Sequence, residues 1–319
     1  MTRSAPARPA ARRTRPTALV AGLAGLACLA LVAARAVSAA PQLRNGTDGP
    51  PAAGTDEQPA TIAWPARGQA AYVLGDGQPA ASPDERPAPI ASLAKVMTAY
   101  LTLKSYPLSG AQDGFTVTVT AAQARAEAKD AAQHQSVVAV HAGERLTERQ
   151  LLEALLIPSG DNIAGMLADE VAGSETRFLA EMNAEARALG MGQTTYTDPS
   201  GFDPGTVSTA ADQLRVFQQA MRSPVFGEIV SMAAVTLPVA GTVTNFNPLI
   251  GEGYVGKTGS DSAAGGCLAF LTRVTVGGRS LTAVGVVMGQ GEGSTTSALL
   301  AAAGEAAEQI VASGATARG

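Results

Sequence analysis

The chain contains very little cysteine and histidine. Its 319 residues include two cysteines, Cys28 and Cys267, and two histidines, His134 and His141. Two distant cysteines cannot form a disulfide framework, and neither residue type occurs at the spacing of a zinc site. We therefore expect no metal and no cofactor. A serine–histidine–aspartate hydrolase is also a poor candidate, because the sequence has no Gly-x-Ser-x-Gly pattern.

Aromatic residues make up only 4% of the chain, and its charges are unevenly distributed. Positions 1–39 hold six arginines and no acidic residue, which leaves 17 basic against 27 acidic residues in the rest of the chain. The net charge of −10 on this part of the chain repels phosphate backbones, and its few aromatic rings offer little surface on which bases could stack. The low aromatic content and the negative net charge argue against nucleic acid as a partner.

The N-terminus has the composition of an export signal. A basic stretch precedes an apolar run at 18–34, and small residues at 36–40 suit a signal peptidase. We expect 1–39 to be a signal peptide; the alternative is an uncleaved anchor with an N-terminal membrane association. Residues 40–65, rich in proline and glycine without periodicity, predict a flexible linker. The protein is therefore expected to be extracytoplasmic, secreted or associated with the cell envelope.

The remaining part, residues 66–315, predicts one α+β domain. Period-two patterns predict strands at 69–74, 116–120, 136–140, 253–258, 267–276 and 280–288. Helical periodicity predicts helices at 92–104, 151–156 and 297–311, and two more after Ser174 and Ser208. Helices dominate the middle of the domain, while strands lie at both ends of it. The two ends of the domain are therefore expected to complete one sheet.

Lysine is scarce, which draws attention to Lys95. The chain has 23 basic residues but only four lysines, and Lys95 lies in an apolar helix that we expect to be buried nearly all round. Burial disfavours the ammonium form, and Ser92 lies one turn earlier on nearly the same side. A neutral amine beside a hydroxyl is a nucleophile with its general base. The alternative is that Ser92 only caps the helix.

Two further motifs follow in order. Ser159-Gly160-Asp161-Asn162 lies in a tight turn between two helices, and Lys257-Thr258-Gly259 lies on a strand. Taken alone, the first is an ordinary turn and the second an ordinary strand end. Together with Ser92-x-x-Lys95, at separations of 67 and 98 residues between the motifs, they form the combination used by penicillin-recognising serine enzymes.

The chain therefore resembles the serine D-alanyl-D-alanine carboxypeptidases, the low-molecular-mass penicillin-binding proteins, over roughly residues 66–315. Further ordered matches lie at 197–201, 245–249 and 264–265. The resemblance implies a β-lactamase/transpeptidase-like α+β fold, with an antiparallel five-stranded sheet flanked by helices and a helical lobe at about 105–224. It also implies removal of the terminal D-alanine from peptidoglycan stem peptides through an acyl-enzyme, with β-lactams as covalent inhibitors.

The resemblance assigns roles to five of the motif residues. Ser92 would attack the carbonyl of the penultimate D-alanine, and Lys95 would take its proton. Ser159 would relay a proton toward the nitrogen of the leaving D-alanine. Lys257 and Thr258 would hold the terminal carboxylate of the substrate, because a cationic lysine suits a carboxylate.

The resemblance places the remaining site residues around the same cleft. Backbone N–H groups of the nucleophile and of Ser260 would form the oxyanion hole. Gly256 and Gly259 would let a substrate strand approach the edge strand closely. The family usually has asparagine where this chain has Asp161, and Asn162 follows directly, so either residue could face the substrate.

Two other functions share this fold. A class A serine β-lactamase needs a glutamate in a Glu-x-x-Leu-Asn context to activate the deacylating water, and no such string follows Asn162. A non-catalytic penicillin sensor would have no need to retain Ser92, Lys95, Ser159 and Lys257 together. Both remain alternatives to the carboxypeptidase.

Overall fold

The computed structural model describes residues 61–318 except 292 and 294, all within a compact unit that spans Asp56–Gly319. The expected signal peptide at 1–39, and the expected linker up to residue 60, lie outside the described residues. Within the described part, none of the helices combines the length and hydropathy needed to cross a bilayer.

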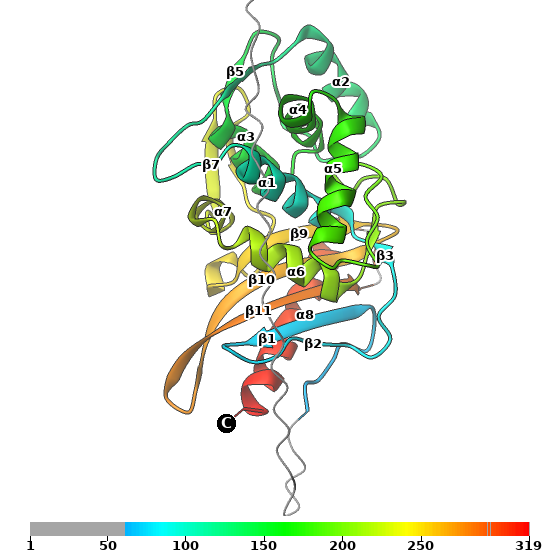
Figure 1. Cartoon of the computed structure of the whole chain (residues 1–319), viewed down its shortest axis with the longest axis vertical. Coiled ribbons are helices and arrows are strands. Elements are labelled where there is room, and N and C mark those ends of the chain that lie inside the picture. Colours follow the sequence, from blue (N-terminus) through cyan, green and yellow to red (C-terminus); the bar gives the residue numbers. More distant parts are fainter. Residues whose placement is uncertain (1–60, 292, 294, 319) are drawn as a thin grey trace, which may run out of the picture. The chain divides into compact units, whose positions relative to one another are not determined.

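A five-stranded antiparallel sheet forms the centre of this unit, as the sequence predicts (Figure 1). Its strand order is β2-β1-β11-β10-β9, so the two ends of the domain meet in the middle of the sheet. The strands are β1 (Gln69–Leu74), β2 (Ala80–Ala81), β9 (Val255–Asp261), β10 (Gly265–Val276) and β11 (Arg279–Gln290). Strand β9, which carries the Lys-Thr-Gly motif, lies at the edge and pairs only with β10.

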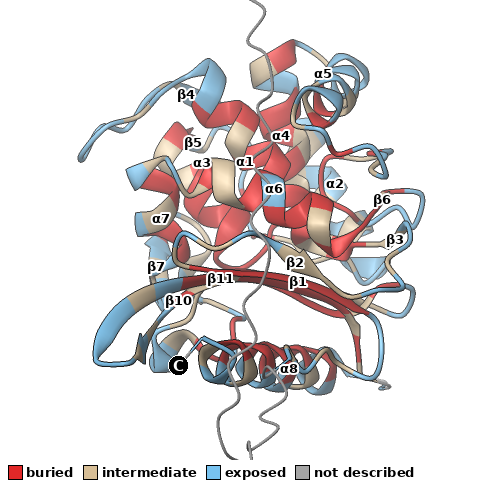
Figure 2. Ribbon diagram, turned by 60° about the horizontal axis from the view of Figure 1, so that its bottom comes forward, coloured by how far each residue is buried: buried red, intermediate tan, exposed pale blue. Residues whose placement is uncertain are grey.

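Helices cover both faces of the sheet (Figure 2). One face packs on α8 (Thr296–Thr316). The other face packs on the helical half, which comprises α1 (Ala94–Ser105), α2 (Ala121–Ala132), α3 (Glu148–Leu156), α4 (Asp161–Ala172), α5 (Glu175–Ala188), α6 (Ala210–Ala220) and α7 (Pro224–Val230). Strand side chains alternate between the two cores: Leu268 and Phe270 belong to the α8 side, and Cys267 and Ala269 to the helical side.

Short elements complete the fold. Two 3-10 turns, η1 (Ala91–Leu93) and η2 (Ile250–Glu252), precede α1 and β9. Three two-stranded sheets pair β3 (Ala88–Pro89) with β6 (Val207–Ser208), β4 (Thr116–Thr118) with β5 (Arg145–Thr147), and β7 (Ala234–Leu237) with β8 (Gly241–Thr244). The expected burial of α1 is confirmed, since Lys95, Thr98 and Thr102 are buried along with its apolar residues.

The predicted strand at 136–140 is wrong. This segment has no strand partner, because side chains satisfy its backbone instead: the N–H groups of Ser136, Val138 and Val140 donate to carboxylate or amide oxygens of Asp161, Asn162 and Glu127, each at 3.0 Å. Every second backbone N–H of this segment therefore bonds to a side chain of α2 or α4 and not to a neighbouring strand.

Glu148 is a buried carboxyl at the first position of α3. It is 1% exposed, and its Oε1 has no hydrogen-bond partner among the described residues. Burial raises the pKa of Glu148 from 4.5 to about 7, against a weaker opposing effect of a hydrogen bond that the backbone of Phe115 donates to the carboxyl group. The folded state therefore favours the protonated carboxyl.

Glu148→Gln is expected to raise the free energy of unfolding at pH 8 by about 1–2 kcal/mol and to change it little at pH 4. Because the pKa in the folded state is raised, the stability that the protonated acid contributes is present below about pH 4.5. It is lost as the pH rises through about 7. Urea unfolding at both pH values measures the difference, with the exposed Glu181→Gln as a matched control. An equal loss of stability at both pH values would contradict this account.

Candidate active site

The Ser-x-x-Lys motif lies where η1 leads into α1. Ser92 is in the 3-10 turn, and Ala91 before it has a left-handed backbone with φ of 45°. Lys95 lies in the first turn of α1 with no exposed surface, and its Nζ is 2.7 Å from Ser92 Oγ. The hydroxyl and the amine that the sequence predicts to meet are therefore in hydrogen-bond contact.

Lys95 Nζ has three oxygen partners. It donates to Ser92 Oγ, to Asp161 Oδ1 at 2.5 Å and to the carbonyl oxygen of Ser200 at 3.0 Å. Lys95 is therefore enclosed by a hydroxyl, a carboxylate and a backbone carbonyl. The predicted neutral amine, which is the form that can accept a proton from Ser92, stays a prediction.

Asp161 and Asn162 make different contacts within the protein. Asp161 begins α4, and its two carboxylate oxygens bind Lys95 and the backbone N–H of Ser136. Asn162 points elsewhere: its side chain accepts from the N–H of Val138 at 3.0 Å and donates to the carbonyl of Val138 at 2.8 Å. Asp161 is the member of the pair that meets Lys95.

Ser159 and Lys257 meet across the boundary between the helical half and the sheet. Lys257 Nζ donates to Ser159 Oγ at 2.9 Å and to the carbonyl of Thr258 at 2.8 Å. Ser159 has a left-handed backbone with φ of 64° and is 4% exposed. Burial, followed by the positive charge of Lys95, lowers the pKa of Lys257 well below its usual value, although Asp161 opposes this. An anionic substrate at this position would favour the charged form of Lys257.

The glycines of β9 permit close packing within the protein. A Cβ on Gly256 would collide with the carbonyl of Ala269 on β10, and one on Gly259 would lie 3.1 Å from the backbone nitrogen of Ser92. The expected close approach of a substrate to this strand stays a prediction. Gly259 brings the edge strand up to the turn that carries the nucleophile.

A cleft of about 550 Å³ lies between β9 and the helical half. Four of the predicted site residues line it: Ser92, Ser159, Thr258 and Ser260. Lys95, Lys257 and Asp161 are not among the residues that line this cleft. Lys95 contacts Ser92, Lys257 contacts Ser159, and Asp161 contacts Lys95. The structure thus brings all seven predicted site residues to one place.

Sequence reasoning missed other residues of the cleft. His134 and Ser136 line it, as do Phe246, Pro248 and Leu300. Phe246 is 44% exposed, although large apolar side chains are usually covered. Phe246 and Pro248 belong to the matched segment 245–249, which was a signal for their location. For the location of His134 at the cleft, the scarcity of histidine in the chain was the only signal in the sequence.

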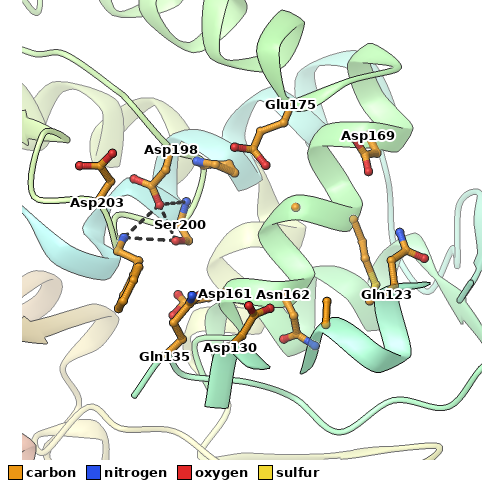
Figure 3. Close-up of a pocket in the computed structure, with 15 residues that line it drawn as sticks. Gln123, Asp130, Gln135, Asp161, Asn162, Asp169, Glu175, Asp198, Ser200 and Asp203 are labelled. Carbon is orange, nitrogen blue, oxygen red and sulfur yellow. Dashed lines mark hydrogen bonds between the residues drawn. The ribbon is translucent and has the colours of Figure 1, made fainter. Parts of the chain in front are cut away.

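A second cavity of about 340 Å³ lies on the other side of Asp161, between α2, α4 and residues 198–203 (Figure 3). Its lining includes six acidic residues and no lysine or arginine: Asp130, Asp161, Asp169, Glu175, Asp198 and Asp203. Asp198 is fully occupied within the protein, where it accepts hydrogen bonds from Ser200 and its neighbours. In the described part of the chain, no group of histidine, cysteine and acidic residues has the geometry to hold a metal ion.

Comparison with known proteins agrees with this geometry. The sequence profile of a family described as D-alanyl-D-alanine carboxypeptidase matches residues 80–291. The chain is 36% identical over 165 residues to the D-alanyl-D-alanine carboxypeptidase DacB2 of Mycobacterium tuberculosis, which covers 49% of this chain and 56% of that protein. It is 33% identical over 168 residues to the D-alanyl-D-alanine carboxypeptidase of Streptomyces sp. strain K15, covering 46% of this chain and 55% of that protein. The chain thus spans about half the length of the curated relatives it matches.

Solved structures share the fold over nearly their whole length. The crystal structure of the Streptomyces K15 DD-transpeptidase superposes with a TM-score of 0.66 at 26% identity, covering 79% of this chain and 99% of that one. A penicillin-binding protein homologue from Mycobacterium tuberculosis superposes with a TM-score of 0.63 at 29% identity, covering 81% of this chain and 95% of that one. These matches agree with the β-lactamase/transpeptidase-like fold expected from the sequence.

Proposed function

The chain belongs to the D-alanyl-D-alanine carboxypeptidase family, and on that premise we propose that it removes the terminal D-alanine from peptidoglycan stem peptides through an acyl-enzyme on Ser92. One observation carries the proposal: the hydroxyl of Ser92 contacts Lys95, while Ser159 contacts Lys257, at the same cleft. The cleft thus holds two hydroxyl groups, each in contact with the amine of a buried lysine, and a hydroxyl beside an amine is a nucleophile with a candidate general base.

Acylation needs the neutral form of Lys95. Ser92 Oγ attacks the carbonyl carbon of the penultimate D-alanine and its proton passes to Nζ of Lys95. The bond from carbon to the leaving nitrogen then breaks, and Ser159 delivers the proton that this nitrogen requires. Backbone N–H groups of Ser92 and Ser260 stabilise the oxyanion, since Gly259 brings β9 against the turn of the nucleophile. Water then hydrolyses the ester and frees Ser92.

The terminal carboxylate of the substrate is held at β9. Thr258 lines the cleft, and Lys257 lies directly behind it with its Nζ on Ser159. A carboxylate bound here favours the protonated form of Lys257, which burial otherwise disfavours. It also accepts a hydrogen bond from Thr258. β-Lactams carry a carboxylate near their reactive carbonyl, so we propose that they bind in the same way and acylate Ser92.

The place of action follows from the substrate. Peptidoglycan lies outside the cytoplasm, and the export-like composition of 1–39 supports an extracytoplasmic location for the catalytic domain at 66–315. An N-terminal membrane association is compatible with this arrangement.

A second candidate is transfer of the acyl group to an amine. The K15 protein, which shares the fold with a TM-score of 0.66, is a DD-transpeptidase. The same acyl-enzyme serves both reactions, and the acceptor decides the product.

The test is release of D-alanine from a stem peptide that ends in D-Ala-D-Ala, with and without an amine acceptor. We expect free D-alanine in both samples and its complete suppression by benzylpenicillin. Hydrolysis of benzylpenicillin at a sustained rate would instead identify a β-lactamase. Stable penicillin binding without D-alanine release would identify a sensor.

A further inference from the structure

Three residues other than glycine have positive φ in the described part of the chain; two of them line the active-site cleft, and the third directly precedes a residue that lines it. Ala91, at 45°, immediately precedes Ser92, and Ser159, at 64°, lines the cleft itself. The third is His134, at 63°, which lines the same cleft. A left-handed backbone costs a residue with a Cβ about 1 kcal/mol, and such strain gathers at functional sites.

The fold does not require histidine at position 134. His134 follows the C-cap of α2, and its N–H donates to the carbonyl of Ala131 while the next N–H donates to that of Asp130. Helix α5 ends with the same pair of hydrogen bonds, but there the left-handed residue is Gly190, with φ of 72°. Glycine adopts this conformation at no steric cost and is the usual residue at this position. The turn therefore does not explain the imidazole.

The position of His134 is fixed relative to the reacting groups. Two residues later, Ser136 exchanges hydrogen bonds with Asp161: its N–H donates to Asp161 Oδ2 at 3.0 Å, and its carbonyl accepts from the N–H of Asp161 at 2.7 Å. The other oxygen of Asp161 binds Lys95. The segment that carries His134 is thus tied through one carboxylate to the base beside Ser92.

His134 is the one residue with a side-chain nitrogen among those that line the cleft. No lysine, arginine, aspartate or glutamate is among the residues that line it, and most of the remaining lining is hydroxyl or apolar. His134 is exposed, and its imidazole has no hydrogen-bond partner within the described residues. Histidine is the side chain that gains positive charge near neutral pH and donates to anions.

We propose that the imidazole of His134 donates a hydrogen bond to a side-chain carboxylate of the acyl-donor peptide, in the residue that precedes D-Ala-D-Ala. This rests on the proposed function, in which Lys257 and Thr258 take the terminal carboxylate. The two D-alanines then offer the imidazole only methyl groups as side chains, so a polar side chain must come from further toward the peptide's N-terminus. His134 is therefore a specificity residue for the acyl donor.

The test compares two peptides, acetyl-L-Glu-D-Ala-D-Ala and acetyl-L-Gln-D-Ala-D-Ala, by calorimetric titration. Binding is measured on Ser92→Ala protein, which cannot be acylated, with and without His134→Gly. Removing one hydrogen bond to a charged group is expected to weaken binding of the Glu peptide about tenfold and of the Gln peptide less than twofold. The matched control is His141→Gly, an exposed histidine that does not line the cleft, and it should change neither value.

His134→Gly also separates a structural role from a binding role. Glycine relieves the left-handed strain, so the melting temperature of the variant should equal or exceed that of the parent. Unchanged binding of both peptides, or equal weakening of both, would overturn the proposal. Failure of the proposed function would be recognised separately, as a wild-type protein that releases no D-alanine from either peptide.

Discussion

Replacing Lys95 by arginine is expected to slow acylation of Ser92 by about 10²–10⁴-fold. Arginine keeps the positive charge, and so the ion pair with Asp161 can persist, but its guanidinium does not deprotonate and cannot take the proton of the serine. The measurement is the rate at which a fluorescent penicillin labels the protein.

The control for this substitution lies on the same helix. Lys104 is exposed and pairs with Glu185 at the surface, so Lys104→Arg should label at the wild-type rate. Lys95 is fully buried, and the bulkier guanidinium is expected to cost about 1–3 kcal/mol in stability, so near-ultraviolet circular dichroism must show that Lys95→Arg is folded. Near-normal labelling by the folded variant would mean that Lys95 is only structural.

Replacing Asp161 by asparagine is expected to move the rising limb of the acylation-versus-pH profile toward lower pH, without loss of activity. The carboxylate lies 2.5 Å from Lys95 Nζ and favours its ammonium form, which cannot accept a proton. An amide removes this negative charge, so the reactive neutral amine is populated at lower pH. Stopped-flow acylation between pH 5 and 10 measures the profile.

Asn162→Ala is the matched control for Asp161→Asn. It leaves the backbone N–H and carbonyl of Val138 without partners, so it should lower the free energy of unfolding by about 1–3 kcal/mol. The pH profile should stay in place, because Asn162 does not contact Lys95. The opposite pattern, with acylation destroyed by Asn162→Ala and the profile unmoved by Asp161→Asn, would identify Asn162 as the substrate contact.

The sequence predicts the sheet and the motif residues well, because these depend on local patterns. Strand patterns at both ends of the domain predict a single sheet, and β1 spans the predicted residues, Gln69–Leu74. The start of α3 is also marked by a local pattern, a capping box in which Thr147 and Gln150 form both hydrogen bonds. The spacing from Ser92 to Lys95 places both side chains on one face of a helix turn, whatever the surrounding fold.

Features that depend on distant contacts could not be predicted in this way. The β-branched residues at 136–140 predict a strand, but Asp161 and Asn162, more than 20 residues later, take its backbone hydrogen bonds. The contact of Lys95 with the carbonyl of Ser200 joins residues that lie 105 positions apart in the sequence. The role of Gly259 depends on its contact with the turn of Ser92, which only the packing of β9 against η1 reveals.

The most direct measurement for the central claim is the site of covalent attachment of a β-lactam. The folded protein is incubated with benzylpenicillin, and its intact mass and peptide map are determined by mass spectrometry. A single adduct on the peptide containing Ser92, absent from Ser92→Ala protein and still present on Ser159→Ala protein after longer incubation, is the predicted result. An adduct on any other residue, or none on folded protein, would contradict the account.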